Sequence, residues 1–97
     1  MNIDIKALHF SLKDEEREYL DKKIARIRKA ENLINDVIFT FAKDAAQYTA
    51  ESSVKFKWGA TAIVKETEYD INPLIDKIID KLEAKINKEK EKNQEKR

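Results

Sequence analysis

Residues 70–92, DINPLIDKIIDKLEAKINKEKEK, decide the fold because they have the pattern of one long amphipathic helix. Apolar residues recur at helical spacing and predict an apolar stripe. The stripe consists of Ile71, Leu74, Ile75, Ile78, Ile79, Leu82 and Ile86. A lysine row lies beside it within roughly 80° of arc. The lysine row consists of Lys77, Lys81, Lys85, Lys88 and Lys92. Asp76, Asp80 and Glu83 lie on the other side of the row, so separate apolar, basic and acidic faces are predicted.

The composition indicates one small domain with unusually many charges. A chain of 97 residues is long enough for a single core. Charged residues make up 40% of it, against roughly 25% in an average domain. Because 20 basic residues nearly balance 19 acidic ones, the net charge is only +1. Composition alone therefore does not indicate a nucleic-acid binder, and the sorting of charges onto helix faces carries the argument.

Several classes of protein are excluded by what the sequence lacks. It contains no cysteine, which excludes disulfides and thiolate metal sites. No apolar run is long enough to span a bilayer, and the N-terminus MNIDIKALHF lacks the features of a secretion signal. We therefore expect a soluble cytoplasmic protein without a membrane partner.

Alternation of apolar and polar residues predicts four strands before the last helix. They are residues 1–9, 34–42, 48–58 and 60–68. A polar connection is expected at residues 43–47. Gly59, the only glycine, is expected in a hairpin turn that requires positive φ.

A first helix is predicted over residues 13–30, between the first and second strands. Ser11 is its expected N-cap, and Asn32 is the expected left-handed residue beyond its end. In the last helix, Asp70 is the expected cap and Pro73 falls in the first turn, where its missing N–H costs little.

The resulting order, β-α-β-β-β-α, predicts an α+β domain like a double-stranded-RNA-binding domain. One four-stranded sheet carries both helices on one face. We expect the domain to span residues 1–92 and the charged tail, 93–97, to fray. The predicted core of the sheet is Ile3, Ile5, Val37, Phe39, Phe41, Val54, Phe56 and Trp58. From the helices it takes Leu20, Ile24, Ile27, Ile75, Ile78, Ile79, Leu82 and Ile86.

The sequence shows no catalytic, cofactor or metal constellation. His9 is the only histidine, and such a residue in a strand is more often structural or exposed than catalytic. A single glycine cannot form a phosphate-binding loop. Trp58 could stack on a base, but its phase with Val54 and Phe56 favours the core. We therefore expect no enzyme, no cofactor and no small-molecule substrate.

The basic rows of the two predicted helices are the remaining candidate for function. If the two helices lie side by side, their basic side chains line one shared groove, which would bind phosphates by charge and spacing. The candidate contacts are Lys22, Lys23, Arg26, Lys29, Lys77, Lys81, Lys85, Lys88, Lys90 and Lys92. Two other interpretations stay open: the helix dipole favours bases at the end of the first helix, and lysines can merely solvate a surface.

Two segments match patterns of a known family. The last helix follows D-M-Y-x-A-I-D-x-x-x-D-K-L-x-x-Q-L-x-K-x-K-x-K at Asp70, Ile75, Asp76, Asp80, Lys81, Leu82, Lys88, Lys90 and Lys92. Residues 17–27, REYLDKKIARI, follow R-E-[FY]-[VL]…K-[FLI]-x-[KR]-L. With the predicted topology, they make the chain resemble the bacterial ribosome hibernation-promoting factors, also called ribosome-associated inhibitor or sigma-54 modulation proteins. It departs from the family pattern at Ala7, Asn72, Pro73 and Ala84.

The resemblance implies a stress or stationary-phase factor that binds the small ribosomal subunit. Its partner would be 16S-type rRNA at the decoding region, where it would block mRNA and tRNA and inhibit translation while preserving idle ribosomes. The ten basic residues above would then be rRNA contacts. We expect the short form, without the dimerisation domain of longer members. The alternatives are a non-ribosomal α+β protein-interaction module and a binder of free double-stranded RNA.

Overall fold

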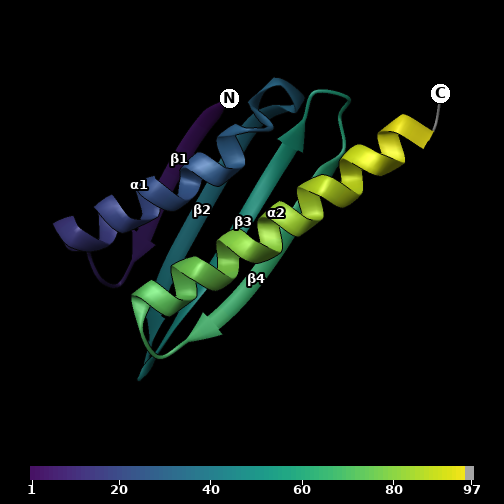
Figure 1. The fold of residues 1–97 in the computed structure, drawn as a ribbon. Coiled ribbons are helices and arrows are strands. Elements are labelled where there is room, and N and C mark those ends of the chain that lie inside the picture. The colour runs from purple at the N-terminus through teal and green to yellow at the C-terminus, as the bar shows by residue number, and fades with distance from the viewer. Residues whose placement is uncertain (96–97) are drawn as a thin grey trace.

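Two helices cover one face of a four-stranded sheet in the computed structural model, which describes residues 1–95 (Figure 1). In chain order the elements are β1 (Asn2–Leu8), α1 (Asp14–Arg28), the 3-10 helix η1 (Glu31–Leu33), β2 (Ile34–Asp44), β3 (Gln47–Phe56), β4 (Thr61–Glu68) and α2 (Ile71–Glu95). The predicted class and order are confirmed. Helix α2 continues into the predicted tail, 93–97, and the last two residues of that tail lie outside the described residues.

The strands lie in the order β1-β2-β3-β4, which follows the chain. Strands β1 and β2 are parallel because α1 crosses between them, whereas β2-β3 and β3-β4 are antiparallel neighbours. The register places Ile5 beside Phe39, and Phe39 beside Ser52. Figure 1 shows α1 over the β1-β2 side of the sheet and α2 over the β3-β4 side. Within residues 1–95, no helix covers the other face of the sheet.

The core lies between this sheet and the helices, and most of its predicted members are buried. Ile3, Ile5 and Trp58 are the exceptions, since they are only partly buried. Both isoleucines belong to β1, which lies at an edge of the sheet. Trp58 follows the end of β3 and stacks on Phe56, with ring centroids 4.8 Å apart. The core also contains residues outside the predicted set, namely Ile34, Ala50, Ala62, Val64, Ile71 and Leu74.

The connection between β2 and β3 is shorter than predicted. Asp44 pairs with Gln47, so only Ala45 and Ala46 remain outside the strands, and the prediction of a loop over 43–47 was wrong. Ala45 adopts a φ of 55°, a conformation that usually favours glycine. The β3-β4 connection confirms its prediction, because Gly59 has a φ of 93°.

The ends of α1 also differ from prediction. Its N-cap is Lys13 rather than Ser11, and the main-chain N–H of Lys13 donates to Glu16 Oε1 at 2.8 Å. Asn32 lies within η1 and is not left-handed; α1 ends at Arg28, and its C-cap Lys29 keeps helical dihedrals. Tightening into a 3-10 turn therefore replaces the expected left-handed ending.

Replacing Gly59 with alanine should lower the free energy of unfolding by about 1 kcal/mol, because an L-residue pays that much in the left-handed region. No atom of the described part of the chain lies within 4 Å of an added Cβ, so the cost is conformational and not steric. Urea unfolding measures it. Ala45→Gly is the matched control and should not destabilise, since its φ is also positive. A neutral Gly59→Ala would contradict this account.

Candidate nucleic-acid interface

The rotation of α2 about its axis determines where its charges lie. Every residue of the apolar stripe is at most 5% exposed, against the sheet and α1. With the stripe turned inward, Asp76, Asp80 and Glu83 face α1. Lys77 and Lys81 lie on the opposite side, over β4, the strand that α2 follows in Figure 1. The predicted separation of the faces therefore exists in the fold.

Two carboxylates on the acidic face of α2 bind one arginine of α1. Arg26 Nη1 lies 2.8 Å from Asp80 Oδ1, and Arg26 Nη2 lies 2.6 Å from Glu83 Oε1. The hydrogen bond to Glu83, followed by that to Asp80, raises the pKa of Arg26 above its ordinary value. A planar guanidinium with several donors suits such a bridge. Arg26 therefore holds the two helices together.

A second contact joins the helices closer to their N-termini. The Tyr19 hydroxyl donates to Asp76 Oδ1 at 2.5 Å, and Lys23 Nζ lies 3.4 Å from the same oxygen. Lys23 Nζ also lies 5.4 Å from the centroid of the Tyr19 ring. The hydrogen bond to Asp76 is the main reason that the pKa of Tyr19 is raised. Asp76 thus belongs to the seam between the helices.

The lysine row has its own partners on β4. Lys77 Nζ forms an ion pair with Glu68, and Lys81 Nζ lies 3.3 Å from Glu66 Oε2. The same ammonium group donates to the main-chain oxygen of Lys65 at 2.9 Å. The hydrogen bond with Lys77 lowers the pKa of Glu68. The N-terminal half of the row is therefore partly neutralised within the molecule.

The structure does not form the predicted groove between two basic helix faces. Lys23 and Arg26 point toward carboxylates of α2, whereas Lys77 and Lys81 point toward carboxylates of β4. Two basic surfaces result, one on each side of α2. The two surfaces are separate because the acidic face of α2 lies between the two sets of basic side chains.

Five candidate contacts remain without an ion pair among the described side chains: Lys22, Lys29, Lys85, Lys88 and Lys90. Lys92 lies 3.8 Å from Glu89, one turn earlier on α2. Lys85 and Lys88 line an open groove beside β4 together with Lys65. The sequence interpretation missed Lys65, although its phase opposite Ala62 and Val64 placed it on the solvent side of β4.

Other chemistry finds no support in the part of the chain that is described. His9 is exposed at the end of β1 and has a positive φ of 69°. Residues 1–95 contain no group of three acidic or histidine side chains suited to a metal ion. No helix in this range combines the length and the apolar character needed to cross a membrane. The basic surfaces remain the candidate site.

Comparisons with known proteins bear on the family and the fold of the chain. The family model described as "Sigma 54 modulation protein / S30EA ribosomal protein" matches residues 3–94. A ribosomal subunit interface protein from Coxiella burnetii superposes with a TM-score of 0.83 at 23% identity, over 93% of this chain and 98% of that one. The N-terminal domain of Protein Y from Thermus thermophilus gives 0.77 at 25% identity, over 91% and 98%. No curated protein sequence matches the chain.

Replacing Arg26 with methionine should lower the thermal midpoint, because Asp80 and Glu83 lose the cation that they share. The loss should shrink in high salt, which screens the remaining repulsion. Arg17→Met is the matched control, since the one carboxylate paired with Arg17 among the described side chains is Asp21, at 3.6 Å, and both side chains are mostly exposed. Differential scanning calorimetry compares the two. Equal midpoints for both variants would show that Arg26 does not join the helices.

Proposed function

This chain belongs to the sigma 54 modulation protein / S30EA ribosomal protein family, and on that premise we propose that it is a ribosome hibernation factor. Its domain, residues 1–92, binds 16S-type rRNA at the decoding region of the small subunit. There it keeps mRNA and tRNA out, inhibits translation and preserves idle ribosomes in the cytoplasm. The family match over residues 3–94 is the observation that carries this proposal.

The basic side of α2 over β4 supports a contact with RNA backbone. Lys85 and Lys88 are one turn apart and have no acidic partner among the described side chains. Phosphates of RNA can therefore approach them without displacing an internal carboxylate. Ribosomal RNA is largely A-form, in which phosphate and shape contacts dominate recognition. Contacts between the lysine row and phosphates do not depend on the base sequence and involve no catalysis.

The dimensions of the molecule support a blocking mechanism. The domain measures 46 × 21 × 18 Å and is built around one continuous core. A rigid body of this size that binds in a channel excludes other molecules from it, so binding alone is enough to inhibit translation. The bonds of Arg26 and Tyr19 across the helix seam preserve that shape.

Reversing Lys85 and Lys88 to glutamate should abolish co-sedimentation with purified ribosomes in a sucrose gradient. The expected binding is electrostatic: with about six phosphate contacts, affinity falls roughly 10³-fold when the salt concentration rises from 50 to 200 mM. Reversing two of the contacting charges replaces attraction to phosphate with repulsion. The far-UV spectrum and thermal midpoint should stay near wild type. The Lys85/Lys88 pair is a sharper test than Lys81, which already bonds to Glu66 and to Lys65.

The matched control reverses Lys6 and Lys55, which are exposed on the helix-free face of the sheet. It changes net charge equally and should leave co-sedimentation intact. Equal loss in both variants would indicate a general charge effect. Wild-type protein that stays at the top of the gradient at low salt would contradict the proposal and favour a non-ribosomal module. Bound protein that leaves decoding-region bases reactive to chemical probes would contradict the assigned location.

Replacing Glu66 and Glu68 with glutamine should strengthen ribosome binding, because Lys77 and Lys81 lose their internal partners. Each lysine newly engaged should steepen the salt dependence by about 0.7–0.9 in log–log slope. Titrations at several salt concentrations measure both effects. The control, Asp4→Asn with Glu51→Gln, removes the same charge from the helix-free face. An equal gain in the control would assign the effect to net charge and not to ion pairing.

A further inference from the structure

A cavity of about 310 Å³ lies where the C-terminal end of α1 and η1 face the second half of α2. It lies on the α1 side of α2, away from the groove of Lys85 and Lys88. Its apolar lining consists of Ala30 and Leu33, which are partly buried, and of Ile27 and Ile86, which are 1% and 2% exposed. The volume is at the small end of ligand pockets, which are roughly 300–1,000 Å³. It therefore suits a group of modest size.

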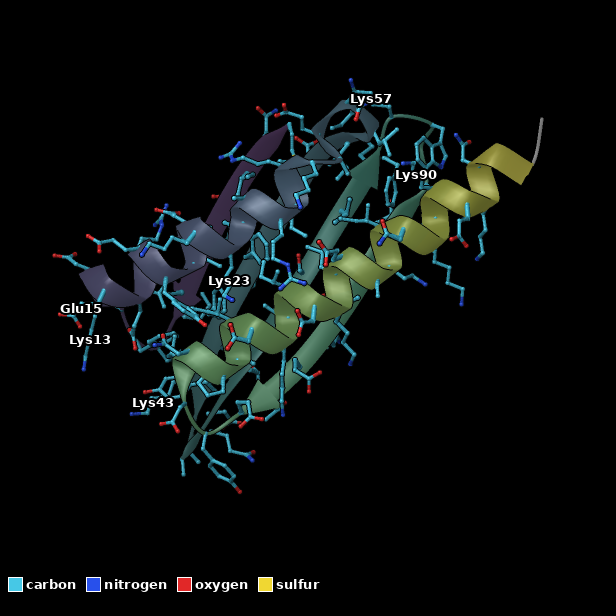
Figure 2. The ribbon with its side chains drawn as sticks, in the orientation of Figure 1. Lys13, Glu15, Lys23, Lys43, Lys57 and Lys90 are labelled. Carbon is cyan, nitrogen blue, oxygen red and sulfur yellow. The ribbon has the colours of Figure 1, made fainter. Side chains whose placement is uncertain are left out.

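The rim of this cavity is cationic. Lys29 and Lys90 both line it, both are exposed, and neither pairs with a carboxylate among the described side chains. Figure 2 shows Lys90 on the second half of α2. Glu83 is the one acidic residue in the lining, and Arg26 binds it at 2.6 Å, which compensates its charge. An anion at the rim would thus meet two lysines that are not engaged.

Two carboxamides complete the lining. Asn32, from η1, and Asn87, from α2, are exposed and make no side-chain hydrogen bond within the described residues. A carboxamide carries a donor and an acceptor in one plane, which matches the edge of a nucleobase. A phosphate backbone alone could accept from the carboxamide NH2 groups, but it would leave the carboxamide oxygens and the apolar lining unused.

We propose that this cavity binds an unpaired nucleotide. The base lies over the partly buried Ala30 and Leu33, its edge bonds to Asn32 or Asn87, and its phosphate is held by Lys29 and Lys90. Proteins that recognise RNA by sequence usually bind such splayed-out nucleotides. The inference deepens the proposed function and rests on it for the source of the nucleotide, an unpaired position of RNA; a free ribonucleotide offers the same chemistry.

The test is an NMR titration of the whole chain with the common ribonucleoside monophosphates and with a short single-stranded RNA. A fully paired RNA hairpin is titrated in parallel. We expect the single-stranded RNA to shift the side-chain amides of Asn32 and Asn87. Replacing both with alanine should weaken that binding about tenfold, as expected from the loss of a base-edge contact. Asn72→Ala, an exposed site at the other end of α2, is the control and should not change it.

Each outcome decides between the sources or overturns the proposal. Shifts at Asn32 and Asn87 with monophosphates alone assign the cavity to a free nucleotide, and shifts with single-stranded RNA alone assign it to RNA. Shifts with neither, or equal shifts with the paired hairpin, overturn it. Co-sedimentation of wild-type protein with ribosomes is scored separately. Sedimentation without shifts at the cavity supports the proposed function and overturns the nucleotide site. Shifts at the cavity without sedimentation support the nucleotide site and overturn the proposed function.

Discussion

The burial of the α2 apolar stripe is the interaction on which the remaining structure depends. Its residues are nearly inaccessible to solvent, and each buried aliphatic side chain contributes roughly 1.5–3 kcal/mol. Turning the helix by even one residue would bring some of them into water. With the helix orientation determined by this burial, Asp80 and Glu83 must face α1, and Lys77 and Lys81 must face β4. The electrostatics of the molecule therefore follow from its packing.

Periodicity predicted which face of each element is buried, because burial leaves a direct record in the spacing of apolar residues. The inward residues of β2 and the stripe of α2 were found in this way. The turn at Ala45 was not, since neither Ala45 nor Ala46 is a typical turn residue and the strand register alone brings Asp44 beside Gln47. Similarly, Lys13 is an unusual N-cap, so the search for a hydroxyl or carboxylate selected Ser11.

The sequence predicted which basic residues form the candidate site, but it predicted their arrangement in space only in part. The spacing of lysines gave a row on one side of α2, but it contained no information about what lies opposite that row. Glu66 and Glu68 occupy that position because β4 is the last strand of the sheet, a fact of strand order. Arg26 fills an internal role for a similar reason. The family assignment came instead from the joint pattern of both helices, which the match over residues 3–94 confirms.

The bond from Lys81 to the main-chain oxygen of Lys65 has a consequence for the behaviour of the chain in solution. Strand β4 ends the sheet, so its outer main-chain groups form an open template on which another strand could pair. The ammonium group of Lys81 donates to one of those acceptors and places a positive charge at this edge of the sheet. A second chain that approached this edge would have to displace it and bring its own backbone against a positive charge. Lys81 thereby discourages edge-to-edge aggregation.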